Sequence, residues 1–377
     1  MIITKVLYLS QCFDKQPAVA RFSCKVNIKI VMLNSCTNSA TNDDQPEEKR
    51  SFDTVQPTLS NMETPTIVIL TPAADDPMFA DFWQFNFNQL SCKFAEFDIR
   101  VIGAPWMTTP LASDRSRSFI YIANLAWGYH YQPDRWKAWL RDWPKDISLI
   151  NSPSLLLWNT QKTYLQHLQK AGVRTIPTLY VEHVNEEVLI DAAKHFNVSD
   201  LIVKQQISAC SFNILRILVG SDDFASAPRS MCPAEAVAEL TRLDAIHSPM
   251  MIQPFMPSIV QEGEISVFMF NGKVSHGIRS NTQPDDYRVQ FEHGGVTTAQ
   301  KELSTEMLEL AHAAINACPE LPVYARIDMI RDVSTGLFCI IEVELIEPNL
   351  FLEHAPDGGT SFARAILHAS GLLNYNE

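Results

Sequence analysis

The sequence predicts an α/β protein whose C-terminal part is of the α+β class. Residues 66–127 read as a strand, a helix and two further strands in succession, which is typical of a small parallel sheet. Beyond residue 150, amphipathic helices alternate with strands, and two pairs of strands there are separated by short turns, as in antiparallel hairpins. These two patterns together favour a parallel lobe followed by mixed lobes.

Size and composition narrow the class of protein. The chain has 377 residues, of which 46% are hydrophobic and 19% charged, so it can form two domains or one large domain with several lobes. Its formal net charge is −13 and no cluster of Lys and Arg is visible, which argues against a nucleic-acid partner. No run approaches the roughly 20 apolar residues of a membrane helix, so we expect no membrane partner. The eight cysteines form no CxxC pair and favour free thiols in a reducing cytoplasm.

The first 61 residues differ from the rest of the chain. Residues 34–61 are rich in Asn, Ser and Thr and lack periodicity. Such a segment buries too little apolar surface to offset its chain entropy. We therefore expect residues 1–61 to be a disordered extension, with Met62 as a candidate start of the functional chain.

The parallel lobe is expected to begin with a buried strand. "TIVILTP" (66–72) is a short apolar run of the kind that forms such a strand. The segment 78–94 is a helix candidate, and 97–105 and 118–127 read as two further strands. Alternation of this kind places the strands side by side in one parallel sheet.

A long helix is predicted over residues 152–173. Ser152 is a candidate N-cap, Pro153 suits the first helical position, and Gly172 suits the position just after the last turn. Lys162 would lie on this helix.

The rest of the chain alternates in the same way. The segment 264–280 reads as a hairpin, because "FNGK" puts Asn271 and Gly272 where a type I′ turn needs them. A second hairpin is expected over 323–345. The other expected elements are helices over 186–196 and 303–317 and strands over 200–207 and 250–257.

The second hairpin carries unusual charge. "IIEVELIEPNLF" (340–351) places Glu342, Glu344 and Glu347 in an apolar, strand-like run. A turn centred on residues 333–335 would set Asp328 opposite Ile340 and diagonal to Glu342. Alternation of side chains then puts two sets of residues on opposite faces. The core face would hold Val323, Ala325, Ile327, Met329, Cys339, Ile341, Val343 and Leu345.

The opposite face would carry Arg326, Asp328, Glu342 and Glu344 within the distance of diagonal neighbours. Three carboxylates beside one guanidinium are costly unless something neutralises them. Magnesium ions are one answer, because Asp and Glu oxygens are their preferred protein ligands. A solvated face and the acid/base pair of a glycosidase are the other interpretations of the hairpin taken alone.

The same hairpin resembles the last core strands of ATP-grasp enzymes, where an Arg-x-Asp strand precedes a strand ending in Glu-x-Glu or Glu-x-Asn. Five further segments occur in the order found in the branch that includes O-ureido-D-serine cyclo-ligase, and more distantly in glutathione synthetase and D-alanine:D-alanine ligase. These segments are "LAWGYHYQPDRWKAWL", "WNTQKTYLQHLQKAGVRTIPT", "LIVKQQISA", "IQPFMPSIVQEGEISVFMFNGKVSHGIRS" and "DYRVQFEHGG".

The resemblance implies a role for the charged face. Asp328, Glu342 and Glu344 would be ligands of two Mg²⁺ ions, with Mn²⁺ as the alternative ion. Arg326 would contact the transferred phosphoryl group and, with Arg288, would be catalytic.

The resemblance also implies an ATP site and a substrate site. Lys162 and Lys204 would hold the ATP phosphates, as compact point charges can. Gln253 to Met256 would present backbone groups to adenine. The implied ATP-binding set is Lys162, Lys204, Gln253, Phe255, Met256, Glu262 and Glu264. The implied substrate-binding set is Arg279, Arg288, Gly294 and Gly295, because an arginine fork suits a carboxylate or acyl phosphate and glycines allow close approach of backbone amides.

The chain departs from the family pattern in three places. The usual Lys-Pro after the second phosphate strand is "KQQ" here, and the loop "ISACSFN" (207–213) lacks the glycines that normally lie over the phosphates. Family members often have Arg-Lys after the first hairpin, whereas this chain has Arg279-Ser280. These changes predict a stiffer or differently shaped phosphate lid.

The implied architecture is an ATP-grasp fold with an N-terminal parallel α/β lobe (62–152) and an ATP-grasp domain (153–377). That domain would consist of a central lobe (153–253) and a C-terminal lobe (254–377), two α+β lobes that clasp ATP. A homodimer is common in related enzymes and compatible with the sequence, which leaves the oligomeric state open.

The implied activity is an ATP- and Mg²⁺-dependent ligation of a small-molecule carboxylate, expected to be amino-acid-like, to an amine. The carboxylate would be activated as an acyl phosphate, which a nitrogen nucleophile then attacks to give an amide bond or a ring. A regulator that binds ATP without catalysis is the second hypothesis, and the glycine-free loop favours it. An acid/base hydrolase is the third, but it would leave Lys162 and Lys204 unexplained.

Overall fold

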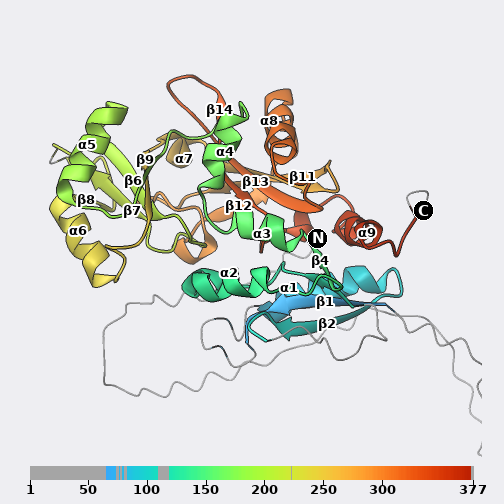
Figure 1. Ribbon diagram of the computed structural model, residues 1–377. Helices are drawn as coiled ribbons and strands as arrows, with labels where there is room; N and C mark the ends of the chain where they lie inside the picture. Colours follow the sequence, from blue (N-terminus) through green and yellow to red (C-terminus); the bar gives the residue numbers. More distant parts are fainter. Residues whose placement is uncertain are drawn as a thin grey trace, which may run out of the picture. The chain divides into compact units, whose positions relative to one another are not determined.

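The computed structural model describes residues 65–73, 76, 79, 83–108, 119–221 and 223–374. The predicted extension over residues 1–61 lies outside these ranges. Residues Glu63–Glu377 form one compact unit, in which three sheets follow one another along the chain (Figure 1). None of the helices in the described ranges has the length and apolar character needed to span a bilayer.

The first sheet is parallel throughout, as predicted. Its strand order is β2-β1-β3-β4, and two strands, β1 and β3, form its centre. The short strand β4 and the helix α2 had not been predicted, and the described helix α1 begins later than expected. The elements are β1 (Thr66–Thr71), α1 (Trp83–Ala95), β2 (Arg100–Pro105), β3 (Phe119–Ile122), η1 (Tyr129–Tyr131), α2 (Pro133–Arg141) and β4 (Ser148–Ile150).

Alternation along β1 supplies both faces of this sheet with core residues. Ile67 and Ile69 belong to a core that also contains Phe94 of α1. Val68 and Leu70 point the other way and share a core with residues of α2, among them Trp136. The strand is therefore buried on both faces, as its continuous apolar run predicted.

The prediction of one long helix over 152–173 is wrong in one respect, because the structure has two helices there. α3 (Pro153–Asn159) and α4 (Tyr164–Lys170) are separated by a turn that contains Lys162. The predicted N-cap is confirmed, since the Ser152 hydroxyl accepts a hydrogen bond from the Leu155 amide at 3.2 Å.

Long-range contacts explain the break. The side chain of Asn159 donates to the Val343 carbonyl at 2.8 Å and accepts from the Leu345 amide at 2.9 Å. The Lys162 amide donates to the Gln206 carbonyl at 2.8 Å. A continuous helix would direct that amide to the carbonyl four residues earlier instead.

The second sheet has the order β5-β9-β6-β7-β8 and is antiparallel except for the pair β7 and β8. Two helices, α5 and α6, share one core with the central strands through Leu189, Leu240 and Val203. The elements are β5 (Leu179–Val181), α5 (Glu186–Phe196), β6 (Asp200–Gln205), β7 (Leu215–Leu218), β8 (Ser230–Met231), α6 (Pro233–Arg242) and β9 (Met250–Pro254).

The third sheet is antiparallel with the order β12-β11-β10-β13-β14. The predicted turn between β10 and β11 is confirmed, because Asn271 and Gly272 have φ of 49° and 75°. The elements are α7 (Ser258–Gln261), β10 (Glu264–Phe270), β11 (Lys273–Asn281), η2 (Phe291–His293), β12 (Val296–Ala299), α8 (Thr305–Asn316), β13 (Tyr324–Arg331), β14 (Phe338–Glu344), η3 (Leu352–His354) and α9 (Thr360–Ala369).

Helices cover one face of this sheet and half of the other. Leu168 of α4 and Leu310 of α8 share a core with Ile327 on the first face. On the second face, Phe268 lies in one core with Phe362 of α9. The remaining half of the second face carries the charged residues of the candidate site.

The predicted register of the last hairpin is wrong. Asp328 lies opposite Glu342 instead of Ile340, and Met329 lies opposite Ile340. Ile341 is therefore an extra residue on β14, which forms a β-bulge beside Asp328.

The bulge also changes which residues enter the core. Phe338 and Ile340 join the core beneath α8. Cys339 and Ile341, which had been expected there, belong to a small separate cluster with Met256. An extra residue reverses the alternation, so the residues between the bulge and the turn exchange faces.

Candidate functional site

The charged residues of the last hairpin lie on one face of the third sheet. Arg326 pairs with Glu344 across the two strands, and Asp328 pairs with Glu342. Directly paired residues of antiparallel strands point to the same side. The sequence predicted this grouping, and the bulge brings Asp328 and Glu342 closer together than the predicted diagonal.

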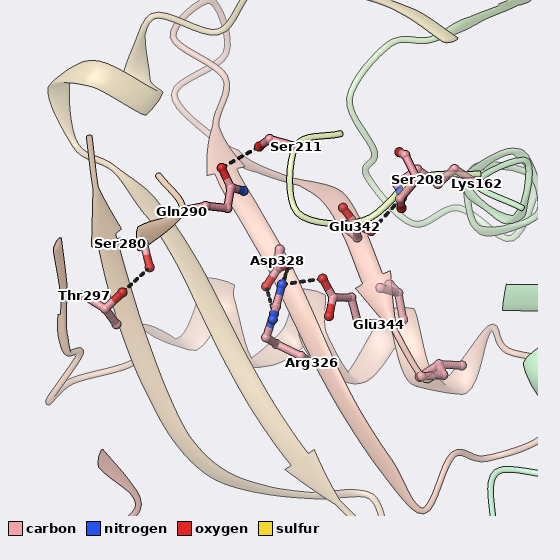
Figure 2. Close-up of polar contacts among 12 residues, drawn as sticks. Lys162, Ser208, Ser211, Ser280, Gln290, Thr297, Arg326, Asp328, Glu342 and Glu344 are labelled. Atoms are coloured by element: carbon pink, nitrogen blue, oxygen red, sulfur yellow. Dashed lines mark hydrogen bonds and ion pairs between the residues drawn. The ribbon is translucent and has the colours of Figure 1, made fainter. Parts of the chain in front are cut away.

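Arg326 is held by two carboxylates. Its Nε lies 2.9 Å from Oδ1 of Asp328, and its Nη2 lies 2.8 Å from Oδ2. The same Nη2 donates to Oε1 of Glu344. Figure 2 shows these contacts on neighbouring strands. Because Asp328 is buried, the ion pair is shielded from water.

Lys162 lies in the turn between α3 and α4, and its side chain contacts the same cluster of charged residues. Its Nζ lies 2.9 Å from Oε1 of Glu342 and donates to the Ser208 carbonyl at 2.5 Å (Figure 2). The lysine is 5% exposed. The sequence analysis placed Lys162 on a helix, whereas the break in that helix is what directs it to the third sheet.

Lys204 is the second buried lysine near these carboxylates. It lies on β6, where its backbone pairs with Met251. Burial lowers the pKa of Lys204 to about 8, although the nearby charge of Glu342 opposes the shift. Its ammonium group is therefore only partly stabilised by the chain itself.

The carboxylates differ in their ionisation. Burial raises the pKa of Glu344 to about 8 despite the nearby Arg326, and it raises the pKa of Glu264 well above its usual range. Burial would also raise the pKa of Glu342, but the charges of Lys162 and Lys204 outweigh it and hold that pKa below its usual range. A carboxylate-rich face with too few cations would gain from a further positive charge.

The chemistry of these donors fits a hard divalent cation. Asp328, Glu342 and Glu344 offer carboxylate oxygens, which Mg²⁺ prefers. Within the described ranges, no three or more His, Cys, Asp or Glu side chains are gathered closely enough to hold a metal ion. Arg326 and Lys162 form ion pairs with these carboxylates. A metal ion would therefore have to replace the two cations at the carboxylate oxygens.

The segment expected beside adenine has most of its side chains engaged. Gln253 is buried and donates to the Thr178 hydroxyl at 2.9 Å. The guanidinium of Arg216 lies 3.6 Å from the ring centroid of Phe255. Met256 belongs to the small cluster around the bulge.

Glu262 and Arg279 contact each other at the start of β10. Arg279 donates through Nη1 to the Glu262 carbonyl and through Nε to Gln300 at 3.2 Å. The Glu262 carboxylate accepts from Nε of Arg331 at 2.9 Å. Both residues are thus held by the chain, and neither contacts the carboxylate cluster through these bonds.

Arg288 is held by a residue that the sequence analysis missed. The fully buried side chain of Asp286 lies 2.9 Å from Nη2 of Arg288 and 2.9 Å from Nε of Arg229. Arg229 comes from the second sheet region and Asp286 from the loop after β11. No sequence pattern indicated this bridge, because its partners are almost 60 positions apart and lie in loops.

Close packing explains why residues 294 and 295 are glycines. A Cβ at Gly295 would lie 1.9 Å from the Val289 carbonyl oxygen. The amides of Gly294 and Gly295 donate to the carbonyls of Phe291 and Gln290. These bonds do not favour the predicted role of the two amides as donors to a ligand.

The glycine-free loop adopts a conformation that usually needs glycine. Cys210, Ser211 and Asn213 have φ of 49°, 57° and 54°. The Ser211 hydroxyl donates to Oε1 of Gln290 at 2.5 Å (Figure 2). The loop therefore contacts the third sheet's loops while its backbone is strained.

Two further buried residues had no predicted role. Both ring nitrogens of His130 and Oε2 of Glu347 are buried without a hydrogen-bond partner among the described residues. Glu347 could have been found as the third glutamate of its run, whereas nothing in the sequence singled out His130.

No protein-family model matches the chain. The sequence is 26% identical over 234 residues to the cycloserine biosynthesis protein DcsG of Streptomyces lavendulae, covering 58% of this chain and 72% of that protein. The crystal structure of the D-cycloserine synthetase DcsG has a TM-score of 0.66 at 22% identity, covering 81% of this chain and 99% of that one.

Two other solved structures have lower scores. The D-alanine–D-alanine ligase of Bacillus anthracis has a TM-score of 0.55 at 16% identity, covering 81% of this chain and 97% of that one. The ATP-grasp ligase PsnB, complexed with a variant of its minimal precursor, Mg and ADP, has a TM-score of 0.54 at 16% identity. That match covers 82% of this chain and all of PsnB.

Proposed function

The chain has the ATP-grasp fold, and we propose that it is an ATP- and Mg²⁺-dependent ligase. It activates a small-molecule carboxylate as an acyl phosphate, which a nitrogen nucleophile attacks. The proteins with similar structures include a synthetase and two ligases, and one of them was solved with Mg and ADP. The proposal extends their kind of activity to this chain.

One observation carries the proposal: a single face, on which Lys162 and Asp328 are buried and the other members half-buried, brings together the cations and carboxylates that phosphoryl transfer requires. Lys162 contacts Glu342, and Arg326 contacts Asp328 and Glu344. Phosphoryl transfer depends mainly on positioned charges, because the chain has little covalent chemistry to perform. An ordinary solvated strand would not bury Asp328 and draw a buried lysine to its charged face.

The roles that we propose rest on the resemblance of the sequence, and the contacts among these residues support them. Asp328, Glu342 and Glu344 would hold two Mg²⁺ ions, which neutralise the charge of the ATP phosphates when bound. Lys162 and Lys204, both buried, would bind the phosphates, which offer their ammonium groups the anionic partner that the protein only partly supplies.

Arg326 would bind the transferred phosphoryl group. Its guanidinium is already fixed by Asp328, so a phosphoryl oxygen would meet an arginine in a set orientation. Acyl phosphate formation makes a bond between the carboxylate oxygen and the γ-phosphorus and breaks the bond to ADP. The amine then forms the C–N bond, and orthophosphate leaves.

The remaining assignments rest on the resemblance of the sequence. Gln253, Phe255 and Met256, with Glu262 and Glu264, would line the ATP site. Arg279, Arg288, Gly294 and Gly295 would line the substrate site. The domain limits 62–152, 153–253 and 254–377, an amino-acid-like carboxylate and a cytoplasmic homodimer belong to the same proposal.

A nucleotide-binding regulator is the second candidate. Two features favour this candidate, namely the strained backbone of loop 207–213 and the ion pair of Arg288 with Asp286. A rigid loop over the phosphates, and an arginine that is paired within the protein instead of with a substrate, suit binding without turnover. The two candidates differ in one measurable property. A ligase releases ADP when its carboxylate and amine are supplied, whereas a regulator binds MgATP and releases none.

The test is calorimetric titration of the full chain with MgATP, followed by an ADP-release screen of amino acids and amines. We expect Glu342→Gln to weaken Mg²⁺-dependent binding about tenfold or more, because it removes the carboxylate that Lys162 contacts. The matched control is Glu353→Gln, which changes an exposed glutamate. Binding that is indifferent to magnesium and to Glu342 would contradict the proposal.

A further inference from the structure

The loop between β11 and β12 is tied to the second sheet through residues 286–290, which we call the strap. The Tyr287 hydroxyl donates to the Ile214 carbonyl at 3.4 Å, just before β7. The Ser211 hydroxyl donates to the side chain of Gln290 (Figure 2). A third tie is the ion pair of the first residue of the strap. The strap therefore joins loops that belong to two different sheets.

The third tie is a carboxylate shared by two arginines. The side chain of Asp286 is fully buried, and its Oδ2 lies 2.9 Å from Nη2 of Arg288 and 2.9 Å from Nε of Arg229. Its Oδ1 accepts from Nε of Arg288 at 3.0 Å. Burial would raise the pKa of Asp286, but the hydrogen bonds of Arg288 and the charges of both arginines hold it below its usual range. Asp286 is therefore an ionised carboxylate.

This bridge has one positive charge in excess, because two guanidiniums share one carboxylate. Arg288 alone with Asp286 would form a neutral pair, which attracts an anion only weakly. Arg288 uses Nε and Nη2 for Asp286, and its Nη1 donates to no acceptor among the described residues. The Arg288 side chain is 21% exposed. A fixed guanidinium with a free nitrogen and unbalanced charge suits an oxyanion.

Arg229 supplies the second charge from the other sheet. It directly precedes β8, whereas Arg288 lies between β11 and β12. Its φ of 60° is in the region that favours glycine, so the chain holds an arginine in a strained conformation there. Its side chain is 51% exposed, so the need to bury apolar surface does not explain its position. The bridge exists only while the loops of the two sheets are together.

We propose that Asp286 and Arg229 are positioning residues for Arg288. Asp286 fixes the guanidinium of Arg288, and Arg229 neutralises Asp286, so that Nη1 of Arg288 can bind a phosphate-like oxyanion. This inference rests on the proposed function, because the reaction supplies that oxyanion as its transferred phosphoryl group. It goes further by naming two residues outside the predicted site and by making the oxyanion site depend on contact between two sheets.

The test uses inorganic phosphate as the probe. The full chain, saturated with MgADP, is titrated with phosphate, and binding is followed by phosphorus NMR. Arg229 is the residue to change, because it is half-exposed, whereas a change at the buried Asp286 would disturb folding. We expect Arg229→Gln to weaken phosphate binding about tenfold, because one positive charge is lost near the site. The affinity for MgADP should stay the same.

A conservative variant and a matched control accompany Arg229→Gln. Arg229→Lys retains the charge and a donor, so it is expected to keep most of the phosphate affinity. Arg242→Gln removes the charge of an arginine that is 60% exposed and pairs with Glu239 on the same helix. It should bind phosphate as the native chain does. An equal loss in Arg242→Gln would show that net charge alone governs binding, which would overturn the inference.

A double-mutant cycle shows whether Arg229 acts through Arg288. Arg288→Gln is expected to lose at least as much phosphate affinity as Arg229→Gln. The double variant should lose no more than Arg288→Gln alone, because Arg229 has no other route to the ligand. Losses that add would show that Arg229 acts independently of Arg288. Phosphate binding that is indifferent to Arg288→Gln would place the phosphate elsewhere. Either result overturns the inference.

Hydrogen exchange separates positioning from a merely structural role. The amides of Tyr287 and Arg288 donate to Oδ1 of Asp286 at 2.8 and 3.1 Å, so they report on the strap. If Arg229 only secured the strap, Arg229→Gln would speed exchange at these amides and leave phosphate binding unchanged, and the inference would be wrong.

The outcomes also distinguish this inference from the proposed function. A chain that binds MgADP but no phosphate, or phosphate without any dependence on Arg229, overturns the positioning role alone. A chain that fails to bind MgADP overturns the proposed function, and the positioning role with it.

Discussion

Arg326 forms a bidentate ion pair with Asp328, which lies only two positions further along the same strand. Nε of the guanidinium is 2.9 Å from one carboxylate oxygen and 3.1 Å from the other, and Nη2 is 2.8 Å from the second. The same arginine reaches Glu344 on the next strand. One cation thereby holds two members of the proposed metal-binding set on one face.

Substitution of Asp328 tests this arrangement. Asp328→Asn is expected to destabilise the fold by about 3 kcal/mol, because it removes one partner of a buried ion pair. It is also expected to abolish the stabilisation that MgATP gives to the native chain. Urea unfolding with and without MgATP measures both effects.

Asp134→Asn is the control for Asp328→Asn. The Asp134 side chain is 95% exposed and pairs only with Lys137 on the same helix in the structure described, so its loss should change stability by less than about 1 kcal/mol. An Asp328 variant that behaves like this control would place the aspartate outside any nucleotide site.

The pH dependence of MgATP binding tests the role of Lys204. Its pKa of about 8 means that the ammonium form is lost as the pH rises through 8 in the free protein. Phosphates prefer the charged form, so binding above pH 8 must take up a proton. Affinity is therefore expected to fall by about tenfold for each pH unit above 8. Calorimetry between pH 7 and 9.5 measures this slope.

Lys204→Met should bind MgATP more weakly at pH 7 and lose this slope. Lys170→Met, at an exposed position at the end of α4, should keep both the affinity and the slope. A slope that persists without Lys204 would assign the proton uptake to another group.

Local patterns predicted much of the fold. The apolar run of β1, the cap at Ser152 and the turn at Asn271 depend on neighbouring residues only, and all three are confirmed. The break before Lys162 was not predictable in the same way. It depends on Gln206, which accepts the Lys162 amide from 44 positions away.

The candidate site likewise contains features that local patterns predict and features that they do not. The common face of Arg326, Asp328 and Glu342 follows from alternation on two adjacent strands, so the sequence contained it. The bulge at Ile341 did not follow, because a hairpin register with one extra residue satisfies the apolar pattern equally well. Asp286 was missed for a different reason, since its two arginines approach from separate loops.

Two glycines offer a contrast between a steric clash and backbone strain. Gly295→Ala is expected to disrupt the loop, because the new Cβ would meet the Val289 carbonyl at 1.9 Å. Gly336→Ala has open space around it but a φ of 74°, so it should cost only about 1 kcal/mol. Thermal unfolding ranks the two variants. Equal costs would contradict the packing of this loop against Val289.

Acid sensitivity should report on His276. Its ring stacks on Phe268 with centroids 4.2 Å apart, and Nε2 lies 3.0 Å from the Leu350 carbonyl oxygen. Burial lowers the pKa of His276 from 6.5 to about 4. Between pH 6.5 and pH 4, the unfolded chain therefore binds a proton at this histidine and the folded chain does not. The stability that is present above pH 6.5 is lost as the pH falls toward 4.

The expected loss from this one group is at most about 1.4 kcal/mol for each pH unit below 6.5. Urea midpoints at pH 7 and pH 5 measure it for the native chain and for His276→Gln, which cannot take up the proton. The variant should be less stable at pH 7 but lose less on acidification. His195→Gln is the control for the loss of a histidine at an exposed position. Parallel losses in the native chain and in His276→Gln would show that other groups govern the acid response.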